Sequence, residues 1–270
     1  MRIKIAILLA LLLILPIASN VSVVKENKEN EMAEITEEDI FSMNIQQYTH
    51  TVLAELGSTT YCPYCPGASE TISKIFSDAS VPFYYITLVY DESDAAMKRG
   101  RELNDFYIPM LYIDGGYSVV DTVSEISYYN AIEEAATREV HDIDMEMEAT
   151  WNGNNIAISL SVSNGESTPY LGHLRICIVE IDSRWIDNAG KHYNYTLMDY
   201  ALNKYVFIGG GKTKNFQIEW KNTYGMEEGN TMVLAYIAHW LPKIQKNPWD
   251  DPKPARFLAQ FVDEVCAVEI

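Results

Sequence analysis

The chain has 270 residues, of which 48% are hydrophobic and 11% aromatic, so it can bury a sizeable core and is not disordered as a whole. Its formal net charge is −18 at pH 7. Such an acidic surface repels phosphate backbones, and we therefore expect no nucleic-acid partner.

The first 20 residues have the layout of a secretory signal peptide. Arg2 and Lys4 precede an apolar run over residues 5–18, and small and polar residues follow. This run is shorter than the roughly 20 apolar residues that a membrane-spanning helix needs. We expect a secreted or extracytoplasmic protein, and the alternative is an uncleaved anchor that tethers the chain to the membrane.

Residues 21–45 are polar and acidic. From Lys25 to Asp39 the chain carries seven carboxylates and two lysines. A segment of this composition buries too little apolar surface to fold by itself. It predicts a flexible linker between the N-terminal segment and the rest of the chain.

Residues 46–140 alternate between strand and helix patterns. Four apolar and β-branched runs predict strands, at residues 51–56, 83–89, 109–113 and 117–120. Three segments with apolar residues at helical spacing predict helices, at residues 68–76, 93–106 and 124–137. The predicted order is strand, helix, strand, helix, strand, strand, helix, which is typical of an α/β domain.

Residues 141–270 show a different pattern, with short alternating runs that turn residues separate. The clearest runs are residues 156–162, 174–179, 215–220, 232–237 and 261–268. Strands at this spacing predict an all-β immunoglobulin- or fibronectin-like sandwich. The sequence therefore predicts two domains that meet near residue 140.

The motif Cys62-Pro63-Tyr64-Cys65 stands between a predicted strand and a predicted helix. Two thiols on the first turn of a helix are close enough to form a disulfide, and the helix end stabilises a thiolate. A zinc site needs four ligands, but the other cysteines, Cys177 and Cys266, are single and distant. The motif favours thiol–disulfide chemistry over zinc binding, and a permanent structural disulfide is the alternative.

Cys177 and Cys266 both lie in predicted strands. An exported protein permits a structural disulfide between them, and two free buried thiols are the alternative. The five histidines are dispersed, without the spacing of metal ligands. The sequence therefore indicates no metal site and no cofactor.

Residues 48–138 resemble the thioredoxin superfamily. Cys-Pro-Tyr-Cys is the active-site sequence of glutaredoxins, and Ile108-Pro109 stands just before a predicted strand. The resemblance implies that the Pro109 peptide bond is cis and faces the cysteine pair. It also implies that Glu55 lies behind the cysteines and helps to move protons. The whole chain resembles secreted prokaryotic proteins that place a β-sandwich after a thioredoxin-like domain.

This resemblance implies an exported thiol–disulfide oxidoreductase whose partners are protein thiols and disulfides and an unknown redox partner. Cys62 would attack a substrate disulfide, and Cys65 would resolve the mixed disulfide. The alternative is a non-catalytic envelope or secreted binding protein with a structural disulfide. Catalysis requires an exposed Cys62 sulfur beside Pro109, whereas a binding protein tolerates a covered one.

Overall fold

The computed structural model of the chain describes residues 48–105, 107–248 and 256–270. The predictions of a signal peptide or anchor over residues 1–20 and of a linker over residues 21–45 lie outside these residues. No helix among the described residues is long and apolar enough to cross a membrane. Gln46–Ile270 form one compact unit.

The described residues form three helices and thirteen strands. The helices are α2 (Cys65–Asp78), α3 (Asp94–Glu102) and α4 (Glu125–Ala136). The strands are β1 (Val52–Ser58), β2 (Phe83–Val89), β3 (Met110–Ile113), β4 (Ser118–Val120), β5 (Ile143–Asn152), β6 (Asn155–Asn164), β7 (Tyr170–Ile186), β8 (His192–Ile208), β9 (Thr213–Lys221), β10 (Thr231–His239), β11 (Lys243–Lys246), β12 (Arg256–Ala259) and β13 (Val262–Glu269). The seven elements from β1 to α4 occur in the predicted order.

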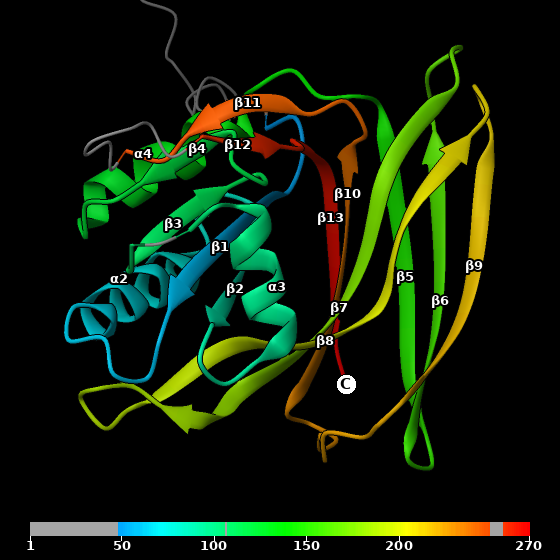
Figure 1. Cartoon of the computed structure of the whole chain (residues 1–270). Coiled ribbons are helices and arrows are strands. Elements are labelled where there is room, and N and C mark those ends of the chain that lie inside the picture. Colours follow the sequence, from blue (N-terminus) through cyan, green and yellow to red (C-terminus); the bar gives the residue numbers. More distant parts are fainter. Residues whose placement is uncertain (1–47, 106, 249–255) are drawn as a thin grey trace, which may run out of the picture. The chain divides into compact units, whose positions relative to one another are not determined.

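A mixed sheet of eight strands runs through the unit in the order β13-β10-β7-β8-β2-β1-β3-β4 (Figure 1). Its two halves join where β8 pairs in parallel with β2, at Thr196 and Thr87. The Thr87 hydroxyl donates a hydrogen bond of 2.8 Å to the carbonyl of Asn194 beside this pair. Strands β13, β10, β7 and β8, which form the second half, therefore belong to the same sheet as β1, the strand that leads to the cysteine motif.

The predicted fold class, an α/β thioredoxin-like domain followed by a separate immunoglobulin- or fibronectin-like sandwich, is wrong. The structure is mostly β, and its largest sheet crosses the predicted domain boundary near residue 140. The physical reason is the length of β7 and β8, which have 17 residues each. They extend beyond the second half and supply a partner to the edge of β2, whose backbone groups would otherwise lack one.

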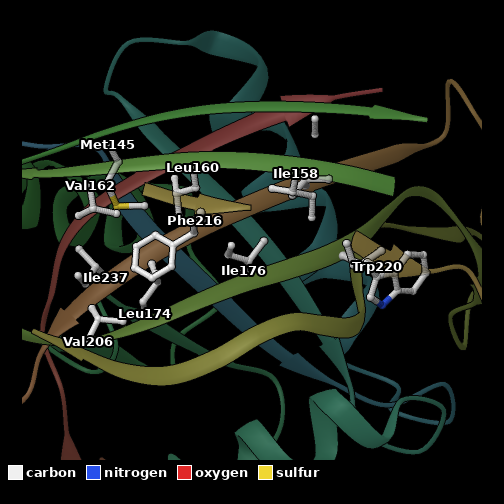
Figure 2. Packing of buried hydrophobic residues seen from close by; sticks show 14 of the residues in the cluster. Met145, Ile158, Leu160, Val162, Leu174, Ile176, Val206, Phe216, Trp220 and Ile237 are labelled. Carbon is white, nitrogen blue, oxygen red and sulfur yellow. The ribbon is translucent and has the colours of Figure 1, made fainter. Parts of the chain in front are cut away.

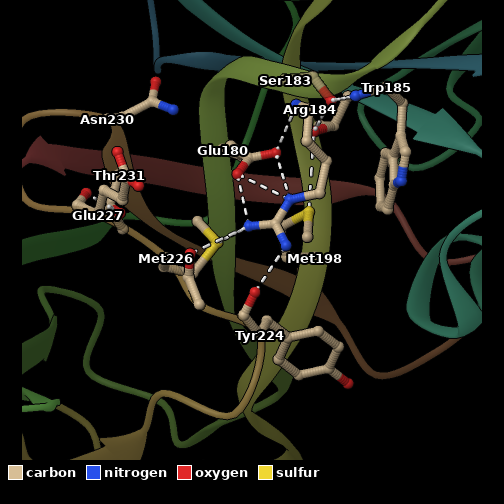
Figure 3. Close-up of polar contacts among 12 residues, drawn as sticks. Glu180, Ser183, Arg184, Trp185, Met198, Tyr224, Met226, Glu227, Asn230 and Thr231 are labelled. Carbon is tan, nitrogen blue, oxygen red and sulfur yellow. Dashed lines mark hydrogen bonds and ion pairs between the residues drawn. The ribbon is translucent and has the colours of Figure 1, made fainter.

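A bulge and an ion pair shape β7 where it leaves the second half (Figure 3). Between Asp182 and Ile186 the strand advances four residues while β8 advances two, from Asn194 to His192. Extra residues of this kind bend and twist a strand. Within the bend, Arg184 donates hydrogen bonds through Nε and Nη2 to the carboxylate of Glu180. The bend directs the tip of the β7–β8 hairpin toward the first half of the chain.

The largest apolar core lies between the large sheet and a second sheet of strands β5, β6 and β9 (Figure 2). On β6, Ile158, Leu160 and Val162 are buried and the residues between them are half-buried. They face Leu174 and Ile176 of β7. The alternation predicted for residues 156–162 is confirmed, but the opposing strands belong to the eight-stranded sheet.

The two faces of the sheet around β1 carry different helices. Leu56 packs with Ile72 of α2 and Ile132 of α4. Leu53, which points to the other face, packs with Leu103 beside α3. Helix α2, which begins at Cys65, and helix α3 therefore lie on opposite faces of the sheet.

Candidate functional site

Cys62 and Cys65 form a disulfide at the start of α2, with Cα atoms 5.5 Å apart. The backbone N–H of Cys65, the first residue of the helix, donates a hydrogen bond of 3.1 Å to Cys62 Sγ. The N–H of Cys62 donates to the carbonyl of Thr59 at 3.2 Å. The disulfide predicted from the C-x-x-C spacing is confirmed.

The N-terminal end of helix α2 offers a suitable environment for a thiolate on Cys62. Free N–H groups at a helix start carry partial positive charge, and here one of them already points at the sulfur. The first turn of α2 contains no acidic residue that would oppose this effect. Reduction of the disulfide would therefore place a stabilised nucleophile at Cys62.

The sulfur pair is covered while its neighbours are exposed. Cys62 is only 3% exposed and Cys65 is fully buried, whereas Tyr61 and Tyr64 are 69% and 73% exposed. This low exposure of Cys62 differs from our expectation for the attacking cysteine. The two tyrosines instead form the surface that an approaching molecule meets first.

The tip of the β7–β8 hairpin, which lies below α2 in Figure 1, contacts the segments on both sides of the disulfide. The Tyr193 hydroxyl donates a hydrogen bond of 2.9 Å to the carbonyl of Thr59, which also accepts a hydrogen bond from the N–H of Cys62. Asn188 Nδ2 donates a hydrogen bond of 3.4 Å to the carbonyl of Tyr61. Lys191 forms an ion pair with Glu70 of α2. The hairpin thus holds both the loop before the disulfide and the helix after it.

The Ile108-Pro109 peptide bond is cis, as the resemblance implied. Pro109 leads into β3, whose first residue, Met110, pairs with Gly57 near the end of β1. Because β1 and β3 are antiparallel, Pro109 and the loop that leads to Cys62 lie at the same end of the sheet. Thr59 and Ile108, one from each segment, line a cavity of about 310 Å³ at this end.

Asp105 also lines this cavity, and it was not among the predicted site residues. The Tyr90 hydroxyl donates a hydrogen bond of 2.5 Å to its Oδ2. Burial raises the pKa of Asp105 to about 7, although the hydrogen bond from Tyr90 opposes this rise. A Cβ atom at Gly57 would lie 2.3 Å from Oδ2, so the carboxyl needs a glycine beside it. A carboxyl that titrates near neutral pH therefore lies at the same end of the sheet as the disulfide.

Glu55 is not placed with the cysteines. It is fully buried, and its carboxylate binds Arg99 of α3 in bidentate fashion, with Nε–Oε1 and Nη2–Oε2 distances of 2.8 Å. Helix α3 covers the face of the sheet opposite to α2, which carries Cys65. The ion pair accounts for a buried carboxylate at this position. A role of Glu55 in proton transfer stays a prediction.

Of the two alternatives for Cys177 and Cys266, the structural disulfide is wrong, because both thiols are free. Strand β10 lies between them, with Leu234 opposite Cys177 and Ala235 opposite Cys266. Two strand spacings exceed the reach of a disulfide, and successive residues point to opposite faces of a sheet. Burial raises the pKa of Cys266 to about 12, so it is a poor nucleophile. Among the described residues, no cluster of His, Cys, Asp and Glu is arranged to hold a metal ion.

No protein-family model matches the chain, and no curated protein matches it. Among solved structures, HBP35 of Porphyromonas gingivalis is similar over 83% of this chain and 76% of its own, with a TM-score of 0.61 and 13% identity. A protein of Agrobacterium tumefaciens is similar over 83% of this chain and 96% of its own, with a TM-score of 0.47 and 13% identity. The similarity to HBP35 is one of fold alone.

Proposed function

We propose that the protein is an exported thiol–disulfide oxidoreductase that acts on protein disulfides through Cys62 and Cys65. The observation that carries this proposal is the 3.1 Å hydrogen bond from the first N–H of α2 to Cys62 Sγ. The order of elements from β1 to α4 and the cis bond before Pro109 support a relation to the thioredoxin superfamily. Export rests on the signal-like N-terminal sequence.

The reaction uses the two thiols in turn. The Cys62 thiolate attacks one sulfur of a substrate disulfide, which forms a mixed disulfide and releases the other substrate sulfur as a thiolate that takes up a proton. Cys65 then loses its proton and attacks Cys62 Sγ. The enzyme disulfide forms, the second substrate thiol leaves, and two electrons have passed to the substrate. The reverse sequence oxidises a dithiol substrate.

A second candidate function is a binding protein in which the disulfide is structural. The 3% exposure of Cys62 favours it, as do the hairpin contacts to Thr59 and Tyr61. For the oxidoreductase, the 3% exposure of Cys62 means that a substrate disulfide reaches its sulfur only when the loop around it moves, and the hairpin contacts restrain that loop. The two candidates therefore differ in whether the disulfide exchanges with external thiols under native conditions.

Reduction of insulin disulfides by dithiothreitol tests the proposal. The wild-type chain should accelerate the reaction, and Cys62→Ser should remove the acceleration because the attacking sulfur is gone. Cys266→Ser is the matched control, since it also removes one sulfur but leaves the motif intact, and it should retain the rate. A Cys65→Ala variant should accumulate a mixed disulfide with insulin. Equal rates for the wild type and Cys62→Ser would support the structural disulfide instead.

A further inference from the structure

A second cavity, of about 330 Å³, opens between α3, β7 and the segment from β10 to β13. None of its lining residues belongs to the disulfide loop, so it is separate from the site described above. Its interior is unusual for this chain, because two buried arginines, Arg99 and Arg175, line it. Glu102 lines it as well, so the cavity holds ionised groups of both signs in a protein with a formal charge of −18.

Two carboxylates, Glu55 and Glu102, pair with the two arginines. Arg99 is occupied by Glu55, which it binds through two hydrogen bonds. Glu102 Oε2 accepts hydrogen bonds from both Arg99, at 3.0 Å, and Arg175, at 2.8 Å. Burial raises the pKa of Glu102, but Arg175 and Arg99 outweigh it and hold the pKa below its usual value. Among the described residues, Glu102 is therefore the single carboxylate that contacts Arg175, and Arg175 shares it with Arg99.

Arg175 is the less satisfied of the two arginines. It is 2% exposed, and its Nη1 makes a hydrogen bond of 3.3 Å with the hydroxyl of Tyr236. Its Nε has no hydrogen-bond partner among the described residues. A buried guanidinium normally uses all of its donors, since an unused one costs free energy. Nε is closed off from solvent, but Nη1 and Nη2 carry two N–H donors each and bond only Tyr236 and Glu102 among the described residues. These two nitrogens therefore keep donors for an additional anionic oxygen.

The mouth of the cavity is apolar. Tyr205, Trp240 and Leu258 line it and are all exposed. Gln260 fixes two of them, because its Nε2 donates to the Trp240 carbonyl at 2.9 Å and to the Tyr205 hydroxyl at 3.3 Å. His173 stacks on Tyr205 with ring centroids 4.3 Å apart. The mouth is therefore a built surface with large apolar side chains in contact with solvent.

We propose that this cavity binds a carboxylate that carries an apolar group. The carboxylate lies toward Arg175, and the apolar group packs against Tyr205, Trp240 and Leu258. A fatty acid and the free C-terminus of a peptide that ends in an apolar residue share this chemistry. The site is independent of the proposed function, because it uses neither Cys62 nor Cys65.

Calorimetric titration of the full chain with four ligands tests the proposal. Octanoate and N-acetyl-glycyl-phenylalanine carry the carboxylate, and octanol and the corresponding peptide amide lack it. At least one carboxylate should bind saturably, and about tenfold or more tightly than its neutral analogue. The tighter of the two carboxylates identifies the source. No saturable binding by either carboxylate, or equal affinity for carboxylate and neutral forms, would overturn the proposal.

Variants place the binding in this cavity. Arg175→Gln should abolish the preference for the carboxylate over its neutral analogue. Because Arg175 is buried and its replacement can unfold the protein, Trp240→Ala, at an exposed position, is the second variant. It should weaken the carboxylate several-fold through lost apolar contact. Ile126→Ala, which removes an exposed apolar side chain from α4, is the control and should bind as the wild type does. Unchanged affinity in Trp240→Ala would sink the assignment.

Discussion

The two sides of α3 carry two desolvated carboxyl groups that have different partners. On the side that faces the arginine-lined cavity, Glu55 meets Arg99 in a bidentate ion pair. On the side that faces the disulfide end of the sheet, Asp105 has a tyrosine hydroxyl at 2.5 Å, and burial raises its pKa to about 7. The comparison teaches that a desolvated carboxyl without a cationic partner has a raised pKa, as Asp105 does, even though it accepts a hydrogen bond.

Removing the guanidinium is the strongest way to break this comparison. Arg99→Leu should lower the free energy of unfolding by about 3–5 kcal/mol, because it leaves Glu55 buried and ionised without a partner. Chemical denaturation at pH 7 measures the loss. Arg101→Leu, an exposed arginine on the same helix, is the matched control and should change stability by only about 0.5 kcal/mol.

The double variant Arg99→Leu/Glu55→Gln completes this experiment. It removes the buried charge together with its partner, so it should recover part of the lost stability. If Arg99→Leu costs no more than Arg101→Leu, the ion pair does not compensate Glu55 and the contrast with Asp105 fails.

Neutralising Asp105 sharpens the comparison through its dependence on pH. The pKa of Asp105 in the folded state is about 7 against an ordinary value of 3.8, so the folded protein holds this proton more tightly than the unfolded chain does. Its contribution to stability is therefore complete below about pH 4 and is lost as pH rises to about 7. A tenfold change in proton affinity corresponds to about 1.4 kcal/mol, so the lost stability amounts to a few kcal/mol.

Asp105→Asn should remove this decline, because an amide does not ionise and still accepts the hydrogen bond from Tyr90. The free energy of unfolding should be measured at several pH values between 4 and 8. Asp121→Asn, at an exposed position, is the control and should keep the wild-type profile. Identical profiles for Asp105→Asn and the wild type would show that Asp105 is ionised throughout.

The disulfide end of the sheet was largely predictable because its signals are local. The C-x-x-C spacing brings Cys62, which lies just before α2, within disulfide reach of Cys65, the first residue of that helix. Pro109 was found from its position before a strand. Asp105 was missed because it stood in a segment whose pattern predicted a helix over residues 93–106, whereas α3 ends at Glu102. Its surroundings depend on the fold, which brings Tyr90 and Gly57 of β1 against its carboxyl group.

The architecture was not predictable because it depends on the pairing of distant strands. Asp182, Ser183 and Arg184 interrupt the apolar pattern that begins at residue 174, so the sequence indicated a short strand where β7 continues to Ile186. The bulge lets these polar residues remain in a strand. The sequence could not show that Cys177 and Cys266 form no disulfide, for a related reason. The faces of the sheet that they occupy follow from their register with β10. Arg175 joins Glu102 only through this arrangement.

The smallest expected effect concerns the hydrogen bonds by which Tyr193 of the β7–β8 hairpin restrains the loop before Cys62. Tyr193 donates its single proton to the carbonyl of Thr59, so Ser58 donates the second bond, also of 2.9 Å. Tyr193→Phe removes both hydrogen bonds and should cost about 1 kcal/mol. If that loss appears in the opening of the loop, dithiothreitol should reduce the disulfide about fivefold faster.

Tyr129→Phe makes the same chemical change on α4, where the hydroxyl bonds Glu133, and its reduction rate should equal that of the wild type. Alkylation and mass spectrometry at timed intervals measure the rates. A faster rate in Tyr193→Phe alone would mean that β8, which lies more than a hundred residues further along the chain, controls access to Cys62. Equal rates in both variants would mean that the loop opens without the hairpin. The contact between Tyr193 and Thr59 would then not restrain the motion that exposes the Cys62 sulfur to external thiols.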